Sequence, residues 1–129
     1  MTALTGSLVD YVIDVRVGSP TFGQWEAVTL DTTDRRAVYL SEGLGHAFCA
    51  LEDDTTAMYL CTATYNPTGE HGIHPLDAEV GLTLPDGIEP LLSAKDEAAP
   101  TLADAAASGL LPTYAACTAW AATLAERPR

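Results

Sequence analysis

The stretch Val-Asp-Tyr-Val-Ile-Asp-Val-Arg-Val, residues 9–17, alternates between apolar and charged side chains. Every second residue from Val9 to Val17 is apolar, positions 10, 14 and 16 are charged, and only Val12 breaks the alternation. Successive side chains of a β-strand point to opposite faces, so a period of two predicts a strand with one buried face. The two glycines and the proline of residues 18–23 predict a turn after it.

Four further short strands are predicted in the first half of the chain, each bounded by a polar or glycine-bearing turn. They cover residues 25–30, 37–40, 46–51 and 57–64. A loop containing two prolines and two glycines follows at 66–75. Several short strands at this spacing are typical of an all-β sandwich or barrel.

The composition changes after about residue 90, and two short helices are predicted there. Thr101 is placed to cap a helix that ends at Gly109, and Thr113 to cap a second one. Apolar residues of the second helix recur at near-helical spacing, which favours packing on the sandwich over ligand binding. We expect one domain, in which residues 1–90 form the sandwich part and 91–129 form a helical segment packed on it.

The charge balance excludes some classes of partner. The 129 residues include 18 Asp and Glu but only 6 Lys and Arg, which gives a formal net charge of −12. Nucleic acids and anionic membranes would repel such a chain, so neither is expected as a partner. The first residues lack the pattern of a signal peptide, and no stretch approaches the length of a membrane span.

The cysteines argue against a disulfide framework. Cys49, Cys61 and Cys117 are odd in number and form no CxxC motif, so a cysteine-based zinc site is not expected either. Reduced thiols suit a cytoplasmic protein.

The three histidines lack the spacing of a zinc-protease motif. His71 and His74 lie in the glycine- and proline-bearing loop near Glu70 and Asp77, so a surface metal cluster is one interpretation. Solvated loop residues are the favoured interpretation. His46 opens a predicted strand, where a structural role is favoured over a functional one on this evidence alone.

Two tyrosines are candidates for chemistry. Tyr59 has small neighbours on its predicted strand face, namely Ala57, Cys61 and Ala63. Small neighbours leave room for a pocket floor, and a phenol with a pKa near 10 can donate a proton to a developing enolate. Tyr65 ends the same predicted strand and could stack on a flat ligand. A role as core or rim aromatics is equally open for both, and Lys95 and Asp96 would by default be a solvated pair.

Six blocks of sequence occur in an order shared with one enzyme family. They are Val-Arg-Val-Gly-Ser-Pro-Thr-Phe-Gly-Gln-Trp (15–25), Ser-Glu-Gly-Leu-Gly-His-Ala-Phe (41–48), Met-Tyr-Leu-Cys-Thr-Ala-Thr-Tyr-Asn-Pro (58–67), Gly-Glu-His-Gly-Ile (69–73), Leu-Ser-Ala-Lys-Asp-Glu-Ala-Ala-Pro (92–100) and Ser-Gly-Leu-Leu-Pro-Thr-Tyr (108–114). Together they closely resemble the dTDP-4-dehydrorhamnose 3,5-epimerases, from about Thr5 to Tyr114.

The resemblance implies a cupin-like jelly-roll β-sandwich, a homodimer, and catalysis without a metal or other cofactor. It implies a small-molecule dTDP-sugar substrate, dTDP-4-dehydro-6-deoxy-D-glucose, whose C3 and C5 are inverted on the way to dTDP-L-rhamnose and related deoxysugars. The C4 ketone makes the neighbouring C–H groups acidic enough for a histidine base, provided that the enolate is stabilised.

The resemblance also implies roles for six residues. Tyr59 corresponds to the tyrosine that donates the proton, and Tyr65 to the one that stacks on the thymine ring. Asp96 corresponds to the carboxylate that pairs with the catalytic histidine and orients it. The positions that contact the nucleotide sugar are His46, Glu70 and Lys95.

One part of the family pattern does not occur in this sequence. The family carries its histidine base in an Arg-Gly-x-His segment upstream of the strand that begins at Val9, and these 129 residues contain no such segment. We therefore expect the C-terminal part of an epimerase, with impaired activity on its own. The alternative is a non-catalytic cupin-like protein that binds a thymidine nucleotide or is structural. A metal-dependent cupin oxygenase is a weaker alternative, because the His-x-His pair of metal cupins is absent at His46.

Overall fold

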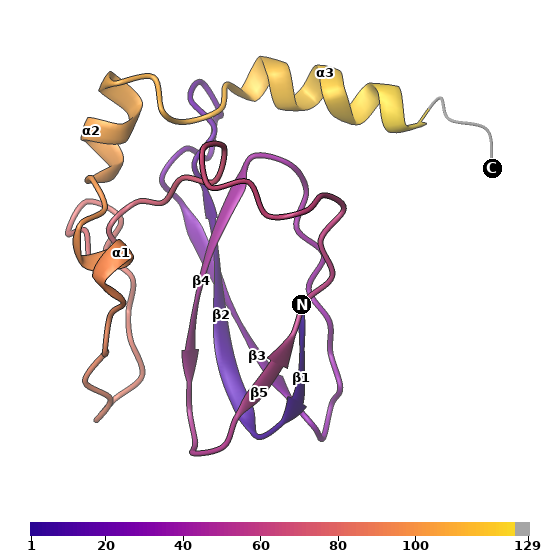
Figure 1. The fold of residues 1–129 in the computed structure, drawn as a ribbon, viewed down its shortest axis with the longest axis vertical. Coiled ribbons are helices and arrows are strands. Elements are labelled where there is room, and N and C mark those ends of the chain that lie inside the picture. Colours follow the sequence, from indigo (N-terminus) through magenta and orange to yellow (C-terminus); the bar gives the residue numbers. More distant parts are fainter. Residues whose placement is uncertain (126–129) are drawn as a thin grey trace.

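The structure is a computed structural model that describes residues 1–125, in which two antiparallel sheets are followed by three helices (Figure 1). The strands are β1 (Thr2–Thr5), β2 (Ser7–Asp14), β3 (Trp25–Asp31), β4 (Leu44–Ala50) and β5 (Thr56–Met58), and the helices are α1 (Ala94–Glu97), α2 (Leu102–Ala107) and α3 (Tyr114–Ala125). The prediction of a mainly β architecture with short C-terminal helices is confirmed. The last four residues of the predicted helical segment, 126–129, lie outside the described residues.

The larger sheet has the strand order β3-β2-β4, so the alternating stretch forms its central strand. Residues directly opposite one another in an antiparallel sheet share a face. Val12 of β2 is opposite His46 of β4 and Glu26 of β3. We call the face that carries Leu8, Asp10, Val12 and Asp14 the Asp10 face, and the face that carries Val9, Tyr11 and Ile13 the Tyr11 face.

The Tyr11 face is covered by the main core. Val9, Tyr11 and Ile13 pack there with Val80 and Leu102, and all five side chains are buried. Burying one such side chain contributes about 1.5–3 kcal/mol. The covering segment is also held by hydrogen bonds, because the Tyr11 hydroxyl donates to the carbonyl of Thr83 over 2.8 Å.

Within residues 1–125, a second sheet covers the Asp10 face only at its Leu8 end. There the small β1–β5 sheet packs against it through a second cluster of Ala3, Leu8 and Leu30, with Ala57 at its edge. Gly6 makes the change of sheet possible, because it adopts a φ of +67° in which a Cβ would overlap Thr55.

The expectation that the central strand has only one buried face is wrong. Asp10 is fully buried and Asp14 is 6% exposed, although both lie on the face predicted to be polar. β2 lies between two other strands, and its charged side chains are buried because they find partners within the protein.

Several strand boundaries differ from the prediction. The first strand ends at Asp14, not at Val17, and a strand that was not predicted, β1, precedes it. Residues 37–40 form no strand, only an isolated bridge from Ala37 to Thr2. β5 ends at Met58 instead of continuing to 64, because its partner β1 is only four residues long.

The two predicted helices are present, but they pack differently. α2 is capped by Thr101, whose hydroxyl accepts a hydrogen bond from the Asp104 amide, and its Leu102 is buried in the core. α3 instead extends away from the sheets (Figure 1), and from Tyr114 to Leu124 its side chains are exposed or half-buried. The packing expected for this helix is thus limited. The division at residue 90 stays a prediction.

Candidate functional site

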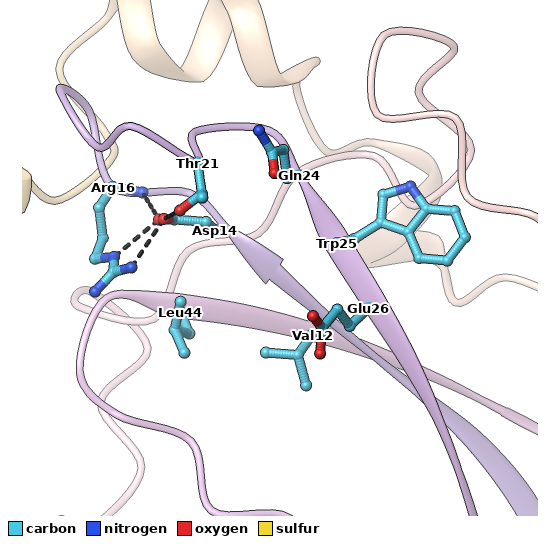
Figure 2. Close-up of a pocket in the computed structure, with 8 residues that line it drawn as sticks. All are labelled: Val12, Asp14, Arg16, Thr21, Gln24, Trp25, Glu26 and Leu44. Carbon is cyan, nitrogen blue, oxygen red and sulfur yellow. Dashed lines mark hydrogen bonds and ion pairs between the residues drawn. The ribbon is translucent and has the colours of Figure 1, made fainter.

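The open half of the Asp10 face is the candidate site. A cavity of about 260 Å³ lies along it, bordered by Val12, Glu26 and Leu44 from the three strands of the sheet and by the turn that follows β2 (Figure 2). His46 is directly opposite Val12, so its side chain lies on the same face.

Asp14 occupies one end of this face and is fully hydrogen-bonded. One carboxylate oxygen accepts from Nε of Arg16 over 2.8 Å, and the other accepts from Nη2 of Arg16 over 2.8 Å and from the hydroxyls of Ser19 and Thr21 over 2.5 and 2.6 Å. The Arg16 guanidinium, helped by the two hydroxyls, holds the pKa of Asp14 well below its usual range. The Asp14 carboxylate is therefore ionised at neutral pH, and its hydrogen bonds hold the turn after β2 in place. The dashed lines of Figure 2 show the bonds to Arg16.

Asp10 and His46 form a second pair in the middle of the face. Nδ1 of His46 lies 3.1 Å from Oδ1 of Asp10, and the His46 side chain is 33% exposed. The ring of Phe48 lies beside the imidazole, with the two ring centroids 6.1 Å apart. Oδ2 of Asp10 has no hydrogen-bond partner among the described residues. The structure thus supplies a carboxylate–histidine pair at a position where sequence reasoning proposed only His46.

The sequence pattern did not indicate Asp10 as a site residue, because it places Asp10 among the charged side chains on the face expected to be exposed. The signal available in the sequence was its place near the middle of an otherwise apolar strand, where a buried acid needs a partner.

The two candidate tyrosines follow β5 in an irregular segment. Tyr59 is 60% exposed and Tyr65 is 68% exposed. The predicted strand face shared by Tyr59 with its small neighbours is wrong, because the strand ends at Met58, and for the same reason Tyr65 does not end a strand. Ala57 packs into the cluster on the Asp10 face, so Tyr59 extends from the sheet that overlies that face.

Glu70 lies in the same loop as Tyr65. Its Oε1 accepts a hydrogen bond from the backbone amide of Asn66 over 3.0 Å, which closes the turn after Tyr65. Glu70 itself is exposed. It therefore fixes the loop in this structure, and its contact with a nucleotide sugar stays a prediction.

Lys95 and Asp96 lie on the short helix α1. Asp96 accepts a hydrogen bond from the hydroxyl of Ser93 over 2.7 Å, as part of the cap of that helix. Within residues 1–125, no hydrogen bond or ion pair joins Lys95, Asp96 or Tyr59 to His46. The roles assigned to these side chains from the resemblance remain predictions.

The interpretation of a surface metal cluster in the 66–75 loop finds no support. Asp77 is buried and accepts hydrogen bonds from the amides of Leu102 and Glu79 over 2.7 and 3.0 Å. His74 accepts a hydrogen bond at Nδ1 from the amide of Leu76 over 3.1 Å. Both side chains therefore organise the loop, and residues 1–125 contain no group of three ligands placed to hold a metal ion. None of the helices described is long and apolar enough to span a bilayer.

Comparison with known proteins identifies the family. The sequence profile described as dTDP-4-dehydrorhamnose 3,5-epimerase matches residues 1–104. The chain belongs to this epimerase family. It is 55% identical over 124 residues to the dTDP-4-dehydrorhamnose 3,5-epimerase of Mycolicibacterium smegmatis, covering 96% of this chain and 61% of that one. It is also 55% identical over 119 residues to the dTDP-4-dehydrorhamnose 3-epimerase of Streptomyces niveus, covering 92% of this chain and 57% of that one.

Solved structures of epimerases share the fold. The 3'-monoepimerase ChmJ from Streptomyces bikiniensis, solved in complex with dTDP-quinovose, superposes with a TM-score of 0.89 at 53% identity. That match covers 92% of this chain and 60% of ChmJ. This chain therefore spans about three fifths of the length of the relatives that it matches.

Proposed function

We propose that this chain is part of an epimerase that inverts C3, or both C3 and C5, of dTDP-4-dehydro-6-deoxy-D-glucose in deoxysugar biosynthesis. The observation that carries the proposal is the family match over residues 1–104, at 55% identity to curated epimerases. Named relatives include both 3,5-epimerases and 3-epimerases, so the number of carbons inverted is left to experiment.

The proposed chemistry needs a base on one face of the sugar and an acid on the other. The C4 ketone acidifies the neighbouring C–H bonds, a base removes one proton to give an enolate, and an acid returns a proton to the opposite face. We assign the acid to Tyr59, whose 60% exposed side chain is accessible to a substrate. Tyr11 is unsuitable as the acid, because burial raises its pKa and its hydroxyl is committed to Thr83.

The remaining candidates are assigned to substrate binding and orientation. His46, on the open half of the Asp10 face, would contact the sugar, and Tyr65 would stack on the thymine ring. Glu70 and Lys95 would contact the nucleotide sugar, and Asp96 would orient the histidine base. That base is placed in the part of the family's length that this chain does not span, because no Arg-Gly-x-His segment occurs in its 129 residues.

The test is the exchange of the C3 and C5 protons of the keto-sugar nucleotide, followed by proton NMR in heavy water. Without its base, the chain alone should exchange these protons about 10²–10⁴ times more slowly than a full-length relative. A peptide that carries the Arg-Gly-x-His segment should restore part of the exchange. Deuterium at C3 alone, or at both C3 and C5, then decides between the two specificities.

Tyr59→Phe should then reduce product formation more than proton loss, because the acid acts after the enolate has formed. Tyr39→Phe is the matched control, since Tyr39 is also an exposed tyrosine, 81% exposed, but has no assigned role. Binding of dTDP without any exchange in the complemented chain would instead favour the non-catalytic alternative. Exchange at full rate by the chain alone would make His46 the base.

We further propose a cytoplasmic homodimer with a jelly-roll sandwich. Within residues 1–125, β3 and β4 are the edges of the larger sheet, and unpaired edges invite strand addition. Large apolar side chains such as Leu60 and Leu91 are 88% and 99% exposed. Sedimentation at micromolar concentration should therefore show a dimer or a larger assembly, and a stable monomer would contradict the proposal.

A further inference from the structure

Asp10 is a costly residue to bury at the centre of a sheet. It is fully buried, and the residues opposite it on the neighbouring strands, Val28 and Phe48, are apolar. A buried carboxylate loses several kcal/mol of hydration, which is recovered only through good partners. Among the described residues, Oδ1 accepts one side-chain hydrogen bond, from Nδ1 of His46, and Oδ2 has no partner.

A purely structural carboxylate on this face looks different. Asp14, four residues along the same strand, is bonded at both oxygens by one guanidinium, two hydroxyls and a backbone amide. Among the described residues, the Asp10 side chain bonds to no turn and caps no helix. The hydrogen bonding that it has within the described residues is directed at a single side chain, and that side chain lies on the open half of the face.

The hydrogen bond also fixes which ring nitrogen of His46 carries a proton. A carboxylate can only accept, so Nδ1 must donate, and the other ring nitrogen is then the one left for a ligand. Nε2 is on the far side of the imidazole from Nδ1 and so points away from Asp10. The Phe48 ring lies beside the imidazole, with the two planes inclined by 37°.

We propose that Asp10 is a positioning residue, which holds His46 with its Nδ1–H on the carboxylate and its Nε2 directed at the sugar of a bound dTDP-sugar. In this form Nε2 is a hydrogen-bond acceptor suited to a sugar hydroxyl. The ligand part of this inference rests on the proposed function, whereas the control of the tautomer by Asp10 does not.

The tautomer can be measured directly by long-range proton–nitrogen NMR on the ¹⁵N-labelled chain. His46 should carry its proton on Nδ1. His74 is an internal control, because its Nδ1 accepts from the Leu76 amide and its proton must therefore sit on Nε2. In Asp10→Asn the Nδ1–H preference of His46 should weaken, because an amide can donate to Nδ1 as well as accept from it, while His74 is unchanged. A proton on Nε2 of His46 in the unsubstituted chain would overturn the inference even if the variant did not fold.

Binding then tests what the positioning is for, with dTDP-quinovose and dTDP as the two probes in calorimetry. Asp10→Asn and His46→Gln should each weaken dTDP-quinovose about 3- to 10-fold, the range expected for one hydrogen bond. The double variant should be no weaker than either single one, and dTDP should bind all forms equally. Weakening by His46→Gln alone, with Asp10→Asn unchanged in both tautomer and affinity, would make Asp10 merely structural. Failure of the chain complemented with the Arg-Gly-x-His peptide to bind either probe would refute the proposed function, and the NMR result would still decide the role of Asp10.

Discussion

Asp14 and Asp10 lie four residues apart on the same face of the same buried strand, yet their surroundings differ. Within residues 1–125, donors from the turn after β2 bond to both carboxylate oxygens of Asp14, whereas Asp10 has one side-chain partner and one oxygen without a hydrogen bond. The first arrangement stabilises the fold, because every lone pair that is removed from water is compensated. The second leaves one buried oxygen uncompensated, so the hydration that Asp10 loses on burial is recovered less fully.

Asp14→Ala is expected to have the largest effect on stability. It would leave the Arg16 guanidinium and the hydroxyls of Ser19 and Thr21 without their shared acceptor, and removal of one partner of a buried pair costs about 3–5 kcal/mol. Urea unfolding measures the loss. The control is Asp34→Ala, which breaks an ion pair to Arg36 that is more than half exposed, and which should cost about 1 kcal/mol or less. An equal loss of unfolding free energy in the two variants would show that the bonds of Asp14 to the turn do not stabilise the fold.

The stabilisation by Asp14 should also disappear in acid. Because its pKa is lower in the folded chain than in the unfolded one, its contribution is complete above the usual carboxyl pKa of about 4 and decreases as the pH falls below it. The difference in unfolding free energy between the wild type and Asp14→Asn should thus be constant from about pH 5 to 7 and narrow below about pH 4. Other acid-sensitive groups such as Asp31 cancel in this difference. A difference in unfolding free energy that increases in acid would show that the pKa of Asp14 is not lowered in the folded chain.

Asp10→Asn is expected to have the smallest effect on stability. It exchanges a buried charge with a single partner for a neutral amide of similar shape, so the free energy of unfolding should change by about 1 kcal/mol or less. Thermal unfolding of the variant, compared with Asp14→Asn, sharpens the contrast between the two carboxylates. A loss of unfolding free energy as large as that of Asp14→Ala would show that both carboxylates stabilise the fold to the same degree.

The sequence predicted the elements whose signal is local. Period-two alternation located the central strand, and Thr101 located the start of a helix. It could not predict the length of β5, because that length is set by pairing with β1, more than fifty residues away in the chain. β1 was not predicted for the same reason, because a four-residue strand has too short a pattern to be detected without its partner.

The candidate site shows the same division. His46 was found because of its resemblance to a family position, but Asp10 was assigned to a solvent-facing row, since alternation alone does not reveal a second sheet packed on the polar side. Tyr59 could be proposed as an acid from its phenol alone. Its predicted strand face was wrong because β5 ends at Met58.

The link between Val17 and the start of α3 has a consequence for the order of folding. The amide of Val17 donates to the carbonyl of Pro112, and the amide of Tyr114 donates to the carbonyl of Val17. These bonds close a loop of roughly a hundred residues, and the entropy lost on closing a loop increases with its length. The hydrogen bonds of Asp14, by contrast, span only residues 14–21 and can form as soon as those residues leave the ribosome. We therefore expect the turn after β2 to form early during synthesis and the attachment of α3 to be among the last steps, because the residues that bond to Val17 are made only when most of the described chain has been synthesised.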